Sequence, residues 1–513
     1  MDQNDAAPIR MTLRRTWLRR GLARPELVAA AACLLAAGCA AGPDFKRPAA
    51  PSVSGYTARP PSATVATPGA AGGAAQAFEA GADISGDWWT LFHSQPLNQL
   101  VDTALANNHD LKAAEAALAA AQETARASRG AFYPNVTAGY SAVRQRQSGA
   151  LAPTPSSNAT QFNLFTPQVS VSYALDVFGL NRRTAEAAQA QAQATRFQML
   201  AAHLTLTSSV VVAAIQEASL NTQIEATREL IEADAKIVEI LKYQQAKGYA
   251  GGLDLAAQQA QLAQAQATLP PLMKQAAQQH HLLAVLTGRF PSQAPPETFA
   301  LASLQLPTEL PLSLPSRLVE QRPDVRQAEA NLHAASAQVG IAAANRLPNI
   351  QLTASAGSTG LTFANTFGPG QAFWTLGAAL TAPIFDGGTL RHQERAARDA
   401  YRQSAEQYAG TVLGAFQNVA DTLTAIDQDA RALKASAAAA EAARTTLDLS
   451  ERQWKAGYAS YLTLLSAEQA YQQARIALVQ AQAARYTDTA ALYQALGGGW
   501  WRRADLAKDT DEH

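Results

Sequence analysis

The chain of 513 residues is 48% hydrophobic, and its 41 lysines and arginines balance 41 aspartates and glutamates. This balance gives no electrostatic reason to expect nucleic acid as a partner. No run of about 18 or more apolar residues follows the N-terminal segment, so we expect no membrane-spanning helix in the mature chain.

Residues 1–38 are predicted to be a signal peptide. A stretch with six arginines, Arg10 to Arg24, precedes an apolar stretch at 27–35 and small residues at 36–38. The signal is also complete from Met11, which is an alternative start. Cleavage would remove Cys33 and leave Cys39 as the single cysteine, so the mature chain could form no disulfide even in an oxidising compartment.

Residues 36–39, Ala-Ala-Gly-Cys, resemble the bacterial lipobox. The resemblance implies a diacylglycerol on the sulfur of Cys39 and an N-acyl lipid, with no other cofactor; an ordinary signal peptide with an incidental cysteine is the alternative. Ala40 and Ala41 stand where an aspartate would signal retention in the inner membrane, so the resemblance also implies the outer membrane. Residues 39–86 have few bulky apolar side chains and are predicted to form an extended strap.

Two copies of one plan follow the strap: a helix, two strands, a long helix and a returning helix. Pro134 and Pro348 mark equivalent points 214 residues apart, and Gly248 and Gly457 lie 209 apart. We therefore predict a tandem duplication, with repeat 1 at 87–287 and repeat 2 at 316–500. Residues 288–315, with six prolines, form a connector, and residues 501–513 form a polar tail that is expected to be disordered.

The first repeat opens on an aromatic cluster that contains Trp88 and Trp89. A plug docked at the foot of a helix is predicted here, with a ligand cage as the alternative. The helix itself is predicted from Pro96 to about Ala131. In the returning helix, from about Leu253 to Leu286, the pair Pro270-Pro271 is predicted to kink or split the helix.

Four runs alternate apolar residues with polar or small ones, as strands with one apolar face do. The alternation is seen from Val136, Val169, Ile350 and Trp374 onward. Each run has about ten residues, the length that a tilted strand needs to cross a bilayer. A bilayer sheet cannot leave edges unpaired, and the smallest barrels have about eight strands, so several chains would share one barrel. Four strands of a half-buried soluble sheet are the alternative.

A single long helix is predicted from Gly388 to Ala456, between the breaks at Pro383–Gly388 and Gly457. Its 69 residues would span about 100 Å. The apolar positions recur three or four residues apart and are largely small, which suits a coiled-coil seam with close neighbours. An equivalent helix is predicted in the first repeat from Asn181 to Lys247.

Several motifs along the chain resemble the outer-membrane efflux protein family, and most closely its lipidated NodT-type branch, which serves tripartite resistance-nodulation-division (RND) pumps. They are Gly42-Pro43-Asp44-Phe45, Trp88-Trp89, Arg322-Pro323-Asp324, Pro383–Gly388, Gly457-Tyr458 and Ala495–Trp500. The resemblance implies an α+β membrane protein: a homotrimer with four strands per chain in a 12-stranded β-barrel, continued by a long α-helical coiled-coil barrel. It implies as partners outer membrane lipid, a periplasmic adaptor (membrane fusion) protein and an inner-membrane RND transporter.

The resemblance also implies an iris-like gate at the periplasmic helix-turn-helix tips. Its residues would be Lys247, Gly248, Tyr249 and Asp254 in repeat 1, and Trp454, Gly457, Tyr458, Thr463 and Ser466 in repeat 2. Family members of the best-known type carry acidic residues shortly after the tip glycine. Asp254 fits this pattern, but Thr463 and Ser466 replace aspartates, which implies closure by packing and hydrogen bonds. A helix N-cap is an equal alternative for Asp254.

No motif for catalysis or phosphate binding occurs in the sequence, so we predict that the protein is not an enzyme. His280-His281 lacks further ligands at metal-site spacing, so no metal site is predicted. A stripe of arginines on the long helix is interpreted as solvated or lumen-facing. Its members are Arg391, Arg395, Arg398 and Arg402.

The sequence therefore predicts a passive outer-membrane exit duct of a tripartite efflux pump, which conducts small molecules such as drugs. One alternative is the duct of a type I protein secretion system, against which the lipid cysteine counts. Another is a periplasmic coiled-coil scaffold lipoprotein without a pore, against which the four strands count. The sequence does not name the transported compounds, because selection in such pumps is thought to reside mainly in the inner-membrane partner.

Overall fold

The computed structural model describes residues 40–58, 63–148, 161–294 and 299–507. The predicted signal peptide at 1–38, Cys39 and the end of the tail at 508–513 lie outside these ranges. The described residues fall into two compact units. The first comprises the residues up to Asp44, Ala127–Glu186 and Ala337–Ala397, and the second comprises Phe45–Arg126, Ala187–Ser336 and the described residues from Arg398 onward.

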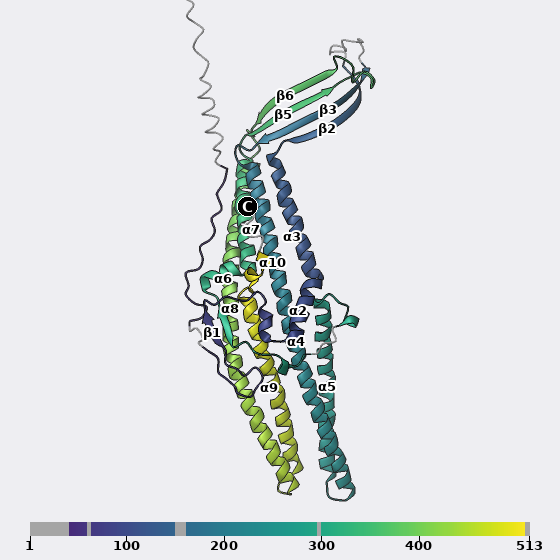
Figure 1. Ribbon diagram of the computed structural model, residues 1–513, viewed down its shortest axis with the longest axis vertical. Helices are drawn as coiled ribbons and strands as arrows, with labels where there is room; N and C mark the ends of the chain where they lie inside the picture. The colour runs from purple at the N-terminus through teal and green to yellow at the C-terminus, as the bar shows by residue number, and fades with distance from the viewer. Residues whose placement is uncertain (1–39, 59–62, 149–160, 295–298, 508–513) are drawn as a thin grey trace, which may run out of the picture. The chain divides into compact units, whose positions relative to one another are not determined.

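The first unit contains an antiparallel sheet of four strands in the order β2-β3-β5-β6 (Figure 1). Repeat 1 supplies β2 (Asn135–Arg146) and β3 (Gln161–Leu175), and repeat 2 supplies β5 (Asn349–Ser358) and β6 (Ala372–Thr381). The two repeats join where β3 pairs with β5. All four predicted strands are present, and β3 begins at Gln161, earlier than the alternation from Val169 indicated.

Over most of its length, the register places the apolar residues of the four strands on one face of the sheet. Near the loop end, Val143, Phe162, Leu164 and Phe373 lie on the other face. One row across the strands is Val136, Val171, Ala354 and Leu376, and the next row is Thr137, Ser170, Ser355 and Thr375. Opposed residues in an antiparallel sheet share a face, so the alternation predicted from the sequence gives one apolar and one polar or small face. In the part of the chain that the structure describes, no hydrophobic core covers either face: every residue of β2 is exposed, and Trp374 is 79% exposed.

Two helical hairpins carry the predicted long helices. In the first, α4 (Leu180–Ala246) is followed by α5 (Gly252–Leu286), and in the second, α8 (Thr389–Lys455) is followed by α9 (Tyr461–Ala495). Both α4 and α8 have 67 residues, or about 100 Å, which confirms the predicted pair of long helices. The remaining helices and strands are β1 (Ala77–Ala80), η1 (Trp88–Phe92), α2 (Gln95–Asn107), α3 (His109–Ser128), η2 (Arg129–Phe132), η3 (Pro291–Gln293), η4 (Leu301–Ser303), β4 (Glu309–Leu312), α6 (Pro315–Gln321), α7 (Pro323–Ala344), η5 (Trp500–Arg502) and α10 (Ala504–Ala507).

One of the described helices, α4, includes a stretch long and apolar enough to cross a membrane by length and composition. The sequence analysis found no such stretch because it looked only for an uninterrupted run of apolar residues, whereas the stretch in α4 is apolar on average. Of that stretch, 56% is buried within the chain, and a buried core helix meets the same criterion.

The helix predicted from Pro96 to about Ala131 is in fact two helices, α2 and α3. Asn108 separates them with an extended ψ of 129°. Its side-chain oxygen accepts a hydrogen bond from the Leu111 N–H at 2.9 Å, and its amide donates to the carbonyl of Leu286 at 3.1 Å. Asparagine competes well for this capping position, so the chain turns here although the helical pattern continues on both sides.

Pro270-Pro271 was predicted to kink or split the returning helix. The helix is not split, because α5 runs through both prolines. Each proline removes the N–H that would bond the carbonyl four residues earlier. These carbonyls belong to Gln266 and Ala267, and both residues are exposed. Water can therefore bond to the freed carbonyls, which limits the cost of keeping the helix intact.

The strap and the connector are tied together in the second unit, where β1 pairs in parallel with β4. The tail beyond Trp500 was predicted to be disordered, but its first residues are helical and paired. Arg503 forms an ion pair with Asp87 at 2.7 Å, and the Nε of Arg502 donates to Asp83 at 2.7 Å. The pairing partners lie more than 400 residues away in sequence, so no local pattern could have indicated them.

The aromatic cluster is a docking plug, as predicted. Trp88 and Trp89 are 0% and 2% exposed in the core of the second unit. Trp88 stacks on Tyr493 of α9, with ring centroids 5.2 Å apart and planes inclined by 14°. Because protein side chains fill the space around both indoles, the ligand-cage alternative does not hold.

Replacing Trp88 by alanine is expected to lower the free energy of unfolding by about 3–5 kcal/mol, because a fully buried ring is lost and a cavity remains. Chemical denaturation followed by circular dichroism measures this change. Tyr249→Ala is the control, since Tyr249 is 84% exposed and should change stability by less than about 0.5 kcal/mol. Equal effects of the two substitutions would contradict the plug.

Candidate functional site

The turns of the two hairpins share one backbone geometry. Gly248 and Gly457 adopt left-handed φ angles of 75° and 76°, a region that favours glycine. The following tyrosines donate their N–H groups back into the helices, Tyr249 to Gln244 and Tyr458 to Gln453, each at 2.8 Å. Such left-handed caps end a helix by satisfying its last carbonyls. The predicted tip glycines therefore form the turns, directly after Lys247 and Ala456.

The aromatic residues of the turns divide into exposed and packed ones. Tyr249 and Tyr458 are 84% and 87% exposed. Trp454 instead packs against Tyr461, with ring centroids 5.6 Å apart and planes inclined by 63°. Tyr461 and Leu464 of α9 are buried in one cluster with Leu241 of α4. This cluster joins the two hairpins next to their turns.

A chain of buried hydrogen bonds lies beside this cluster. The amide of Gln258, which is fully buried, donates to Asp234 Oδ1 at 3.0 Å. The hydroxyl of Tyr461 donates to Gln258 Oε1. About one helical turn further along α5, the amide of Gln469 donates a hydrogen bond to Gln261 Oε1 at 2.7 Å. The residues of α4 and α5 are thus bonded to α9, so packing and hydrogen bonds together hold the hairpins to each other. Sequence reasoning missed Gln258, Tyr461 and Asp234 because their partners lie in other helices.

The predicted polar gate residues of repeat 2 are occupied within their own helix. Ser460 caps α9 and accepts from the Thr463 N–H at 3.3 Å. The hydroxyl of Ser466 donates to the carbonyl of Leu462 at 2.9 Å. In repeat 1 the N-cap of α5 is Gly251, so the suggestion that Asp254 is the N-cap was wrong. Asp254 lies in the first turn, where a carboxylate favours the helix dipole, and its gate role remains a prediction.

Two buried carboxyls line a cleft of about 250 Å³ between α4, α8 and α9. Asp234 and Glu468 each have one carboxyl oxygen with no hydrogen-bond partner among the described residues. Burial, followed by the charges of Asp234 and Glu451, raises the pKa of Glu468 to about 7. The cation that lines the same cleft, Arg475, is paired with Glu229 at 2.6 Å. The contact between the hairpins is therefore sensitive to protonation.

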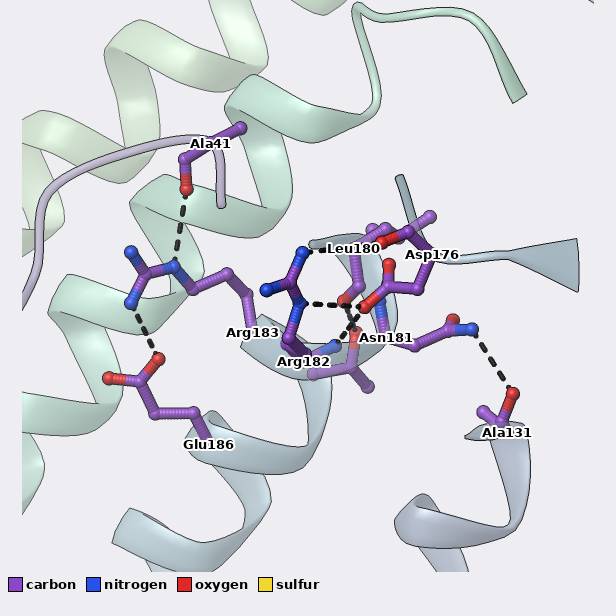
Figure 2. A network of polar contacts seen from close by, with 9 residues as sticks. Ala41, Ala131, Asp176, Leu180, Asn181, Arg182, Arg183 and Glu186 are labelled. Carbon is purple, nitrogen blue, oxygen red and sulfur yellow. Dashed lines mark hydrogen bonds and ion pairs between the residues drawn. The ribbon is translucent and has the colours of Figure 1, made fainter. Parts of the chain in front are cut away.

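A second network holds the segment that directly follows Cys39 in the sequence (Figure 2). Arg183, at the start of α4, has a side chain that is only 5% exposed. Its Nε donates to the carbonyl of Ala41 at 3.2 Å, and its two terminal nitrogens bind Asp44 at 2.6 Å and Glu186 at 2.7 Å. The neighbouring Arg182 points instead to Asp176.

Close backbone contacts reinforce this docking. The N–H of Ala41 donates to the carbonyl of Phe178 at 2.8 Å. Gly42 has a φ of 85°, and a Cβ there would lie 2.4 Å from the Cα of Gly340. Only a glycine fits both requirements. The sequence analysis noted the Gly42-Pro43-Asp44 motif but missed Arg183, whose neighbour Arg182 looks equivalent in the sequence.

Other candidates from the sequence have ordinary partners or positions. His280 Nδ1 lies 3.1 Å from Glu217 Oε1. The stripe on α8 consists of four arginines, Arg391, Arg395, Arg398 and Arg402. All four are exposed, in agreement with the solvated or lumen-facing interpretation.

The sheet with two faces open to the surroundings, joined in sequence to long helical hairpins, defines an outer-membrane channel protein of the efflux type. The family model for the outer membrane efflux protein matches residues 100–289 and 314–498, and the chain belongs to this family. As a member, it is an outer-membrane protein that extends into the periplasm, and it is a channel component rather than an enzyme.

Relatives with curated names include the pyoverdine export outer membrane protein OpmQ of Pseudomonas putida. It is 33% identical over 416 residues, which cover 80% of this chain and 88% of OpmQ. The outer membrane protein OprJ of Pseudomonas aeruginosa is 29% identical, with 90% and 93% covered. Among solved structures, the outer-membrane channel OprN matches with a TM-score of 0.80 at 26% identity, covering 91% of this chain and 100% of the OprN chain.

Replacing Arg183 by methionine is expected to release the segment Ala40–Asp44, because the three hydrogen bonds of the guanidinium are lost. Hydrogen exchange of the Ala41 amide should accelerate on the order of tenfold. Arg182→Met is the matched control and should leave this amide unchanged. An unaltered exchange rate in the Arg183 variant would show that the glycine contacts alone hold the segment.

The stability of the folded protein is expected to depend on pH through Glu468, and the direction of this dependence follows from the pKa of its carboxyl group. Its pKa of about 7 in the folded state exceeds the ordinary 4.5, so the folded state holds the proton more tightly. This contribution to stability is complete below about pH 4.5 and is lost as the pH rises through about 7. The expected size is about 1–3 kcal/mol, discounted for partial exposure of the site.

The measurement compares the melting temperatures of wild type and Glu468→Gln between pH 5 and pH 8. The two proteins share all other titratable groups, so the contributions of these groups cancel in the difference. The difference between the two proteins should change with pH in that window. Glu406→Gln, an exposed glutamate of α8, is the control. Parallel pH profiles for wild type and Glu468→Gln would contradict a buried, protonatable Glu468.

Proposed function

We propose that the protein is the passive, trimeric exit duct of a tripartite efflux pump. It would receive small molecules from an inner-membrane RND transporter through a periplasmic adaptor and release them outside the cell. The observation that carries the proposal is the sheet, whose apolar face lies open and whose outer strands β2 and β6 each have one edge unpaired within the chain. Membership of the efflux family gives this sheet its setting in the outer membrane.

Closure of the sheet follows from its strand directions. Three successive antiparallel pairings make β2 and β6 antiparallel to each other. The β6 edge of one chain can therefore pair with the β2 edge of another chain in the same antiparallel pattern. Three chains with four strands each would form a closed barrel of 12 strands. The apolar face would then meet lipid and the polar or small face would line the lumen.

The turns of the hairpins are the proposed gate. The buried cluster around Tyr461 and the hydrogen bonds of Gln258 would hold the hairpins together in the closed state. The exposed tyrosines, Tyr249 and Tyr458, would face the adaptor or the neighbouring chain. Opening would then require separation of these contacts rather than neutralisation of an acidic ring, since Thr463 and Ser466 carry no charge.

The lipid anchor on Cys39 remains part of the proposal. The described chain begins one residue later, and Ala41 is held beside the start of α4. Such docking would keep diacylglycerol and N-acyl chains near the periplasmic end of the sheet. The lipid distinguishes this duct from a type I secretion duct, which is the second candidate. Names of relatives such as OpmQ, a pyoverdine export protein, favour small molecules as cargo.

Conductance in planar bilayers tests the duct and its gate together. A variant with Tyr249, Trp454 and Tyr458 replaced by alanine is expected to show larger or more frequent conductance steps than wild type, because the contacts next to the turns are lost. The control replaces Phe290 by alanine, an aromatic residue of the connector that is 75% exposed, and should conduct like wild type.

The absence of conductance in both wild type and the tip variant, from protein shown to be folded and trimeric, would exclude the duct. The periplasmic scaffold without a pore would then be the remaining interpretation. Conductance that is equal in wild type and the tip variant would keep the duct but place the gate elsewhere.

A further inference from the structure

The charged residues of the sheet and its outer loops have an unusual distribution. Residues 135–175 and 349–381 include only two charged residues, Arg144 and Arg146, and no aspartate, glutamate or lysine. Both arginines lie in β2, close to its loop end, and both are exposed. In the described chain neither has a carboxylate partner or a side-chain hydrogen bond, although most arginines of the protein do.

By register both arginines lie on the same face of β2 as its apolar row, although near the loop end this face is polar and Val143, Leu164 and Phe162 lie on the opposite face. Side chains alternate along a strand, so Val136, Tyr140, Arg144 and Arg146 share one face of β2. The residues opposite the arginines on β3 are Asn163 and Gln161, which are neutral. A cationic pair therefore continues the face that the proposed barrel would turn toward lipid, at the end where the loops lie.

Aromatic side chains on the same face precede the arginines. Trp374 lies in the row of Ala138 and Val169, Tyr140 in the next row, and Phe165 opposite Ala142. The loop between β5 and β6 adds Phe363, whose ring is 6.3 Å from that of Tyr140 and 6.4 Å from that of Phe165. Phe367 in turn contacts Phe363 at 6.4 Å. Phe363 and Phe367 are 60% and 71% exposed.

Aromatic residues in this order are typical of the boundary between hydrocarbon and head groups. Tyr140 and Arg144 are four residues apart, or about 13 Å along the strand. The arginines thus stand beyond the hydrocarbon, at the level of lipid head groups. The acidic residues of this unit lie instead at the helical end of the sheet, where Asp176 and Asp386 cap the starts of α4 and α8.

We propose that Arg144 and Arg146, with the aromatic cluster of Tyr140, Phe165, Phe363 and Phe367, form a binding surface for lipopolysaccharide in the outer leaflet. The two phosphates of its lipid A would bind the guanidinium groups, and its acyl chains would lie on the aromatic and aliphatic side chains below. Guanidinium is suited to phosphate through paired, charge-assisted hydrogen bonds. The inference rests on the proposed function, because it takes the loop end of the sheet as the cell exterior.

Native mass spectrometry of the detergent-purified trimer, titrated with bisphosphorylated lipid A, tests the proposal. The variant R144Q/R146Q is expected to bind lipid A on the order of thirtyfold more weakly, from two arginines at an anionic surface. The matched control R391Q/R395Q removes two exposed arginines of α8, outside the sheet, and should bind like wild type. Equal affinities of wild type and R144Q/R146Q would overturn the proposal.

A second comparison needs no substitution. Wild type should prefer bisphosphorylated lipid A to its monophosphorylated form and to phosphatidylglycerol, and inorganic pyrophosphate should not displace the lipid. If phosphatidylglycerol bound as tightly as bisphosphorylated lipid A, the surface would bind anionic lipids in general, and the assignment to lipopolysaccharide would be overturned. All proteins are first shown to conduct in planar bilayers. Loss of lipid A selectivity in conducting protein contradicts only this inference, whereas absence of conductance contradicts the duct.

Discussion

Backbone hydrogen bonding at the two free edges of the sheet is the constraint on which the remaining architecture depends. An unpaired N–H or C=O group in hydrocarbon costs several kcal/mol, and about half of the groups on an edge strand point outward. The outer strands, β2 and β6, have no further strand partner among the described residues. In a membrane they would have to pair with other copies, so in the proposed trimer the association of chains is a condition for the strand structure and not a later association of finished barrels.

The tandem duplication provides the parts for such an assembly but the two copies have diverged into complementary halves. Both repeats retain a 67-residue helix and a 35-residue returning helix. Near the turns, however, repeat 1 contributes the buried amide and carboxylate of Gln258 and Asp234, and repeat 2 contributes the phenol of Tyr461. At this point groups of different kinds pair across the hairpins, whereas Gln261 and Gln469, which lie at nearly equivalent positions of the two repeats, pair as identical amides.

Local patterns were sufficient to predict most elements of this fold. Alternation with period two identified the strands and their apolar face, and the absence of breakers between Gly388 and Gly457 identified α8. Two of the errors arose where a distant contact decided the local structure: Asn108 ends α2 while bonded to Leu286, and Arg503 orders the tail through Asp87. At the candidate sites, the tip glycines were predictable because a left-handed turn needs glycine, but Arg183 and Gln258 were not, since their roles depend on partners in other segments.

The location of the ionisable groups distinguishes the proposed gate from one based on an acidic ring. Carboxylates facing a common lumen would repel one another, and salt in the lumen would screen that repulsion. Here Thr463 and Ser466 are neutral and bonded within α9, while the titratable groups Asp234 and Glu468 are buried behind the turns. Buried charges are screened little, and ionisation of Glu468 opposes the packing of the hairpins. If the turns form the proposed gate, proton uptake by Glu468 would strengthen a contact between the hairpins that is buried and therefore depends little on ionic strength.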